Sequence, residues 1–175
     1  MSFELRGRAR RLGDDINTDY IIASTRKRDT LDTAVLQRYL LETVDPAFAT
    51  SVRAGDIIVA GRNFGCGSAM EIAATVILAA GINVVVAQSF ARTFYRNAIN
   101  NGLIPVVCDT GAIKEGDAIA VRLIGGASNV HVEALELTFV GAPLPAIMLE
   151  ILNAGGLAPY MRANAGFLDS VSGPP

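Results

Sequence analysis

A glycine-rich segment that ends in a serine is the part of this sequence best suited to chemistry. Residues 61–68 have the sequence GRNFGCGS and lie between apolar runs at 56–60 and 71–80. This order predicts a strand, a loop and a helix, with Ser68 at the N-cap or in the first turn. Glycine lets the backbone turn sharply or approach a ligand closely. Because the first amides of a helix lack internal partners, the segment predicts a site for a carboxylate or phosphate, with a hydroxyl beside it.

Two polar segments precede this loop. Residues 13–19, GDDINTD, contain three carboxylates, Asn17 and Thr18. The pattern is typical of a turn whose side chains cap nearby backbone donors, and taken alone it favours that structural role. Residues 24–30, STRKRDT, contain three of the fifteen basic residues of the chain. They form either a solvated loop or a contact surface for an anion.

Composition narrows the class of protein. The chain has 175 residues, 51% of them hydrophobic, which is enough for one domain with a buried core. A formal net charge of −2 gives no electrostatic basis for binding nucleic acid. The apolar runs are shorter than the roughly 18 residues that a membrane span needs, and the N-terminal residues lack the apolar region of a signal peptide. We therefore expect a cytoplasmic protein that binds neither membrane nor nucleic acid.

Cysteine and histidine are scarce. The two cysteines, Cys66 and Cys108, cannot supply the three or four thiolates of a zinc knuckle or an iron–sulfur cluster. Cys108 ends an apolar run and is expected to be a small buried residue, whereas Cys66, inside the glycine loop, could be either structural or functional. The single histidine, His131, lies in an alternating segment typical of a surface strand, so a solvated histidine is favoured there. We predict no metal site in this chain.

Hydrophobic periodicity predicts an α/β fold. A strand–helix–strand unit over 56–87 indicates parallel strands joined by a helical crossover, and the segments after residue 116 are typical of antiparallel strands. The chain should form one domain over residues 1–164, followed by a flexible tail at 165–175. Expected strands are 3–12, 56–60, 82–87, 103–108, 117–123, 130–133 and 135–140; expected helices are 31–42, a short turn or helix around Phe48, 68–80, 91–100 and 145–153.

Three segments, taken together and in this order, resemble one family. They are GDDINTD at 13–19, GRNFGCGS at 61–68 and SFARTFYRNAINNGL at 89–103. The last is the most specific, because neither glycine turns nor capping loops would produce it. The chain resembles the small subunits of 3-isopropylmalate dehydratase in the aconitase superfamily over about residues 5–159.

The resemblance implies a fold, a partner and a reaction. The expected fold is the single swivelling β/β/α domain of the aconitase C-terminal type, with a parallel βαβ core and antiparallel strands. The expected partner is a large subunit, in a heterodimer or heterotetramer, that carries a 4Fe-4S cluster which this chain does not bind alone. The expected reaction is dehydration and rehydration of a malate-type 2-hydroxy acid, 2-isopropylmalate in leucine biosynthesis being the first candidate. In the family the cluster iron acts as a Lewis acid and a small-subunit serine removes a proton.

Residue by residue, the resemblance gives two catalytic positions and five that bind substrate. The serine of the family motif falls on Ser68, and the aspartate of its Thr-Asp motif falls on Asp19, which is expected to orient groups rather than to bind metal. An ordinary hydroxyl is a weak base, so the loop amides and the helix N-terminus would have to stabilise the alkoxide. Expected substrate-binding residues are Arg28, which matches the arginine of the family's recognition loop, with Arg26, Gly65, Gly67 and Thr18.

The sequence also departs from the family pattern. Where the family usually has Gly-Ser-Ser-Arg-Glu-His, residues 67–72 read GSAMEI, so a hydroxyl, a guanidinium and an imidazole are lost. Methionine cannot replace a guanidinium that clamps a carboxylate. Either the substrate differs, as in a homoaconitase-like or dimethylmalate-dehydratase-like enzyme, or Arg26 and Arg28 take over. A catalytically degenerate paralogue is the further alternative.

Two other classes of protein compete with the enzyme. A nucleotide- or phosphate-binding module would also use a glycine loop before a helix, but the lysine of a P-loop is absent and Met70 stands where the third Rossmann glycine would be. An inactive homo-oligomeric scaffold is the third hypothesis.

Overall fold

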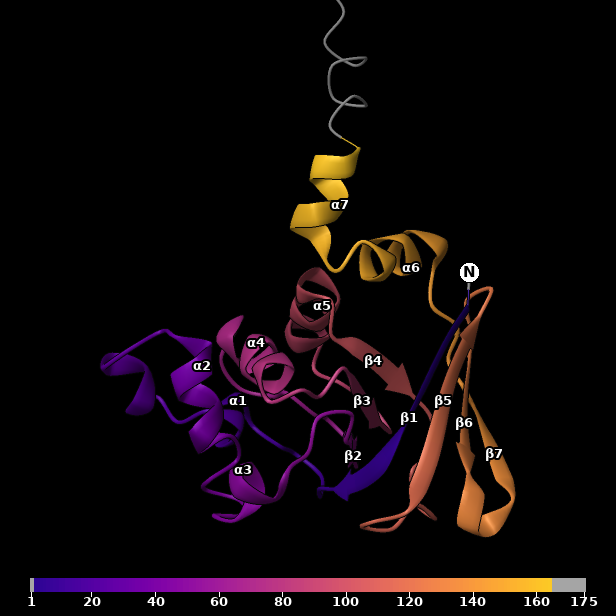
Figure 1. Cartoon of the computed structure of the whole chain (residues 1–175), viewed down its shortest axis with the longest axis horizontal. Coiled ribbons are helices and arrows are strands. Elements are labelled where there is room, and N and C mark those ends of the chain that lie inside the picture. The colour runs from indigo at the N-terminus through magenta and orange to yellow at the C-terminus, as the bar shows by residue number, and fades with distance from the viewer. Residues whose placement is uncertain (1, 165–175) are drawn as a thin grey trace, which may run out of the picture.

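A mixed seven-stranded sheet organises the chain in the computed structural model, which describes residues 2–164. The strand order is β4-β3-β2-β1-β5-β6-β7 (Figure 1). The strands are β1 (Ser2–Arg11), β2 (Ile57–Ala60), β3 (Val84–Ala87), β4 (Ile104–Val107), β5 (Ala118–Ile124), β6 (Ala127–Val132) and β7 (Leu137–Gly141). The helices are α1 (Thr18–Ile21), α2 (Thr33–Leu36), α3 (Phe48–Ser51), α4 (Ile72–Ala79), α5 (Arg92–Asn101), α6 (Ala146–Asn153) and α7 (Leu157–Ala163), with 3₁₀ turns η1 (Arg26–Arg28), η2 (Gln37–Tyr39) and η3 (Glu133–Leu135).

Strand β1 joins a parallel half of the sheet to an antiparallel half. Its last three residues, 9–11, pair in parallel with 57–59 of β2, whereas residues 2–8 pair antiparallel with 118–124 of β5. Strands β2, β3 and β4 continue the parallel half, and β5, β6 and β7 continue the antiparallel half. The mixed α/β fold expected from the sequence is thus confirmed, as are both halves of its sheet.

Two apolar cores lie on the two faces of the parallel strands. In β2, Ile58 and Ala60 belong to the core shared with α4, whereas Ile57 and Val59 belong to the core shared with β5 and β6. Alternate residues of a strand face opposite sides, so a strand buried on both faces is apolar throughout. Figure 1 shows α1 to α4 on one side of the parallel strands and β5 to β7 at the opposite end of the molecule. Among the described helices, none is long and apolar enough to cross a membrane.

Two predicted helices have other bounds in the structure, and two helices were not predicted. The helix expected over 31–42 is divided into α2 and η2, and Leu41 follows with φ +57°. The helix expected from Ser68 begins only at Ile72, because Gly65 and Gly67 adopt φ of +77° and +93° and turn the chain before it. Helices α1 and α7 were not predicted: α1 begins inside the polar segment expected to form a turn, and α7 begins after Gly155 and Gly156, which end the preceding helix. The tail expected at 165–175 lies outside the described residues.

Candidate functional site

The candidate site lies at the carboxyl edge of the parallel strands. Strands β1, β2 and β3 run in the same direction, so the loops that follow them meet at one edge of the sheet. Backbone hydrogen bonds join these loops: the Gly65 amide donates to Ile16 O at 2.8 Å, and the Thr18 amide donates to Cys66 O at 2.8 Å. The Phe64 amide donates to Ser89 O at 3.0 Å. All three segments that carried the family resemblance therefore meet here.

The two glycines before Ser68 allow the loops to pack closely. A Cβ on Gly65 would lie 2.2 Å from Phe94 Cγ, and a Cβ on Gly67 would lie 2.5 Å from Asn17 Oδ1. Both residues also have positive φ, which side chains rarely tolerate. The Gly65 N–H is already used in its bond to Ile16, so this glycine shapes the loop and does not present its amide to a ligand.

Ser68 is exposed at the end of this loop, four residues before α4. The sequence predicted Ser68 at the N-cap or in the first turn of the helix, and it is in neither position; Glu71 is the N-cap and makes no side-chain capping bond. The Thr18 hydroxyl donates to Ser68 O at 3.0 Å and so attaches the serine to α1. Within residues 2–164, no hydrogen bond occupies the amides of Gly67, Ser68 or Ala69. The serine hydroxyl thus has free backbone donors near it, although they belong to the loop and not to the helix.

Asp19 lies in the first turn of α1, and Asn17 caps that helix. The Asp19 amide donates to Asn17 Oδ1 at 2.9 Å. The Asp19 carboxylate accepts a hydrogen bond from the Ser24 hydroxyl and lies 3.7 Å from Lys27 Nζ. Sequence reasoning missed Asn17, Ser24 and Lys27 as individual contributors, although all three stand in the two polar segments that it singled out.

The two predicted arginines have different surroundings. Arg26 forms two hydrogen bonds with the Glu42 carboxylate, at 2.8 and 3.0 Å, and its guanidinium stacks 3.9 Å from the centroid of the Tyr39 ring. The hydrogen bond to Glu42 raises the pKa of Arg26. Arg28 is exposed, and its guanidinium has no ion pair in the part of the chain that the structure describes. Arg28 is therefore the more available of the two for a ligand.

Three phenylalanine side chains form a cluster that supports the glycine loop. Phe64 packs edge-to-face on Phe90 and Phe94, with ring centroids 5.9 and 5.1 Å apart. Both Phe90, in the loop between β3 and α5, and Phe94, in α5, belong to the third resemblance segment. This segment is the most characteristic of the three motifs that resemble the family. Its phenylalanines pack on Phe64 and so hold the glycine loop in place.

Neither cysteine is placed for metal binding or nucleophilic chemistry. Burial raises the pKa of the Cys66 thiol, and the nearby Asp15 carboxylate adds to this rise. Burial also raises the pKa of Cys108 to about 12, and this thiol is buried as predicted. Among the described side chains, no group of three or more histidine, cysteine, aspartate or glutamate residues could hold a metal ion. These residues do not fit an iron–sulfur cluster.

His131 lies in β6, where its Nδ1 is 3.0 Å from the Thr138 hydroxyl of β7. It is remote in the sheet from the serine loop, since β6 belongs to the antiparallel half. The prediction of a surface-strand histidine is confirmed.

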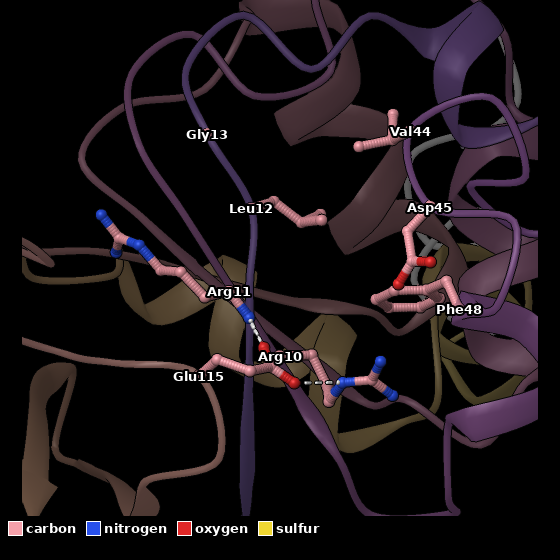
Figure 2. A pocket seen from close by; sticks show the side chains of 8 residues that line it. All are labelled: Arg10, Arg11, Leu12, Gly13, Val44, Asp45, Phe48 and Glu115. Carbon is pink, nitrogen blue, oxygen red and sulfur yellow. Dashed lines mark hydrogen bonds and ion pairs between the residues drawn. The ribbon is translucent and has the colours of Figure 1, made fainter.

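A separate pocket of about 470 Å³ lies beside the end of β1. Figure 2 shows Glu115 joined to both Arg10 and the Arg11 backbone at its wall, so these charges are partnered within the chain. None of the predicted site residues lines this pocket. Its lining residues are Arg10, Arg11, Leu12, Gly13, Val44, Asp45, Phe48 and Glu115.

Residues 11–111 match the aconitase C-terminal domain family. This range includes both polar segments, the serine loop and the aromatic support. The chain belongs to the aconitase C-terminal domain family. Within that family it groups with the small subunits of hydro-lyases.

Individual relatives of this family member cover nearly the whole chain. It is 48% identical over 162 residues to 3-isopropylmalate dehydratase small subunit 1 of Methanopyrus kandleri, an alignment that covers 90% of this chain and 92% of the relative. It is 42% identical over 158 residues to the methanogen homoaconitase small subunit of Methanocaldococcus jannaschii, covering 90% and 91%. A crystal structure of a 3-isopropylmalate dehydratase from the same organism superposes with a TM-score of 0.88 at 40% identity, covering 98% of this chain and all of the other.

Proposed function

We propose that this chain is the small subunit of a two-subunit hydro-lyase that isomerises a malate-type 2-hydroxy acid by dehydration and rehydration. The conversion of 2-isopropylmalate to 3-isopropylmalate, a step of leucine biosynthesis, is the first candidate reaction. The observation that carries the proposal is the exposed Ser68, attached to Thr18 and beside free amides, in a chain that resembles such small subunits over about nine-tenths of its length.

In the proposed mechanism, Ser68 removes the proton from the carbon next to the one that bears the hydroxyl. A serine alkoxide is strongly basic, so it forms only where donors stabilise it, and the amides of residues 67–69 are free to do so. Asp19 orients the groups around it through Ser24 and Lys27. Arg28 contributes to the substrate-binding side, Thr18 holds Ser68 through its hydroxyl, and Arg26 is engaged by Glu42.

The resident metal chemistry belongs, in this proposal, to the partner. The described residues of this chain do not fit a cluster, so we assign the 4Fe-4S cluster to a large subunit, in a heterodimer or heterotetramer. Such a cluster would supply a Lewis acid for the departing hydroxyl. The present chain supplies the base and part of the substrate site.

A homoaconitase-like reaction is the second candidate. The homoaconitase small subunit named above is 42% identical to this chain, close to the 48% of the dehydratase subunit. The residues after Ser68 are Ala69, Met70, Glu71 and Ile72, in place of the serine, arginine, glutamate and histidine usual in the family. A changed carboxylate pocket would follow from this difference.

The test is a substrate panel with the reconstituted enzyme. The chain should be co-expressed anaerobically with the cluster-bearing large subunit of its own genome and assayed with 2-isopropylmalate, homocitrate and 2,3-dimethylmalate. We expect turnover of at least one acid by the pair, and a colourless, inactive preparation of this chain alone. An assembled pair with an intact cluster and no turnover would favour a degenerate paralogue. A rise in the melting temperature on adding ATP or NAD would favour the nucleotide-binding alternative.

A further inference from the structure

Lys27 is a nearly buried cation beside the serine loop. Its side chain is only 14% exposed, although it lies in the polar segment 24–30. The ammonium contacts Met70 Sδ and lies 3.7 Å from Asp19 Oδ1. Lysine is seldom this buried without a strong partner, because removing an ammonium from water is costly.

The partners of this ammonium do not satisfy it. A lysine ammonium has three N–H donors, and a thioether sulfur is a weak acceptor. The distance of 3.7 Å to Asp19 is longer than a hydrogen bond, and the same carboxylate oxygen already accepts the Ser24 hydroxyl. Among residues 2–164, Lys27 Nζ has no other hydrogen-bond or ion-pair partner. Donor capacity therefore remains for an anionic acceptor.

The two contacts of this cation are with residues close in the chain to Ser68 or to its partner Thr18. Met70 follows the serine by two residues, and Asp19 follows Thr18, whose hydroxyl holds Ser68 O at 3.0 Å. The neighbouring cation Arg26 is occupied by Glu42, and Arg28 is exposed. Lys27 is thus the nearly buried cation of this segment with donors to spare.

We propose that Lys27 binds a carboxylate of the substrate next to Ser68. The inference rests on the proposed function and makes it more specific, because it assigns the anion-binding role at this loop to a lysine that reaches it from η1. The substrate carboxylate would then bind the Lys27 ammonium on the side away from Asp19 and Met70. Asp19 helps to hold the ammonium there without consuming its donors.

The test compares inhibitors that differ by one charge in the reconstituted pair. 2-Isopropylsuccinate has both carboxylates but lacks the hydroxyl, so it cannot be dehydrated, and each of its two monoamides has one carboxylate replaced. We expect Lys27→Met to raise the inhibition constant of the diacid roughly 10- to 100-fold, as for a lost charge-assisted hydrogen bond. For one of the monoamides the variant and the wild type should have equal constants. Lys27→Arg should restore much of the affinity for the diacid.

Lys114→Met is the matched control, since Lys114 is exposed and is the other lysine of the chain. It should bind all three inhibitors as the wild type does. Equal constants for Lys27→Met and the wild type with the diacid would overturn the inference. So would an equal loss for the diacid and both monoamides, which would indicate that Lys27 acts only through the position of Asp19. If the wild-type pair turns over substrate and either of these two results is found, the inference about Lys27 fails and the proposed function still holds.

Discussion

At the scale of the residue, the proposal depends on one hydroxyl. Ser68→Ala removes the proposed base but no packing contact, since this side chain is exposed. We expect kcat of the reconstituted pair to fall about 10²- to 10⁴-fold, the usual contribution of a general base. Steady-state kinetics measure the loss, and gel filtration should show unchanged assembly.

Thr43→Ala serves as the hydroxyl control, because Thr43 is exposed and outside the site segments. It should have wild-type kcat. A Ser68→Ala pair with wild-type turnover would remove this serine from the mechanism.

The thiols give a second residue-scale prediction. Burial raises the pKa of both Cys66 and Cys108, so both stay protonated at neutral pH. Because only the thiolate reacts readily, iodoacetamide at pH 7.5 should modify each more slowly than it modifies free cysteine, and the rate at Cys66 should rise as the pH is raised. Mass spectrometry of the labelled peptides measures this. Labelling of Cys66 at the rate of free cysteine would contradict its protected position.

The sequence alone pointed to some residues of the candidate site but not to others. Ser68, Gly65, Gly67 and Asp19 belong to motifs whose spacing is local. The engagement of Arg26 depends on Glu42, sixteen residues away, and that of Lys27 depends on Met70, forty-three residues away. No local sequence pattern encodes such pairings. The sequence therefore could not show which basic residues of the run are paired within the chain and which are free to bind a ligand.

At the scale of the element, the glycine loop explains why α4 begins late. The predicted helix start followed the usual preference of serine for the N-cap. The loop instead returns to pair with residues 16–18 before the helix begins, which needs positive φ at two glycines. Tertiary pairing outweighed a capping preference worth about 1 kcal/mol.

Gly65→Ala tests how tightly this loop is packed. The new Cβ would combine a positive φ with a contact 2.2 Å from Phe94 Cγ. We expect the free energy of unfolding to fall by at least about 2 kcal/mol, measured by urea denaturation of the isolated chain. Gly13→Ala is the matched control, since a Cβ there would meet nothing within 4 Å, and it should change stability by less than about 0.5 kcal/mol. Equal stability of the two variants would contradict the packing described.

An ion cluster joins β1 to Asp56, the residue before β2, and makes stability depend on pH. Burial alone would raise the pKa of Asp56, but hydrogen bonds from Arg8 at 2.7 Å and from the Arg53 amide at 3.0 Å lower it below its ordinary value. The carboxylate therefore contributes stability above its unfolded pKa of about 4, and this contribution is lost as pH falls through the lower folded pKa.

Asp56→Asn should lower the free energy of unfolding at pH 7 by about 2–4 kcal/mol, because it leaves the buried Arg10 without one of its anionic partners. The variant should also lose less stability than the wild type between pH 5 and pH 3. Denaturation curves across that range measure both effects. Parallel pH profiles for the two proteins would show that Asp56 is not the group that titrates.

At the scale of the whole molecule, the strands were predictable from the sequence, whereas their arrangement in the sheet was predictable only in part. Short β-branched runs such as 84–87 are apolar on both faces, which identified the parallel strands. The dual pairing of β1 joins residues 48 apart in its contacts with β2 and more than one hundred apart in its contacts with β5. No local sequence pattern shows such pairings. Short helices such as α2 and α3 have four residues each, too few to show a period.

This arrangement presents the serine loop at one edge of the sheet, where a second subunit would complete the site. The most direct test of that claim is to add increasing amounts of this chain to a fixed amount of the cluster-loaded large subunit and to measure initial rates of isomerisation. We predict no turnover by either subunit alone and a rate that saturates at one equivalent of this chain. Turnover by this chain alone after iron chelation, or by the large subunit alone at the rate of the pair, would contradict the account.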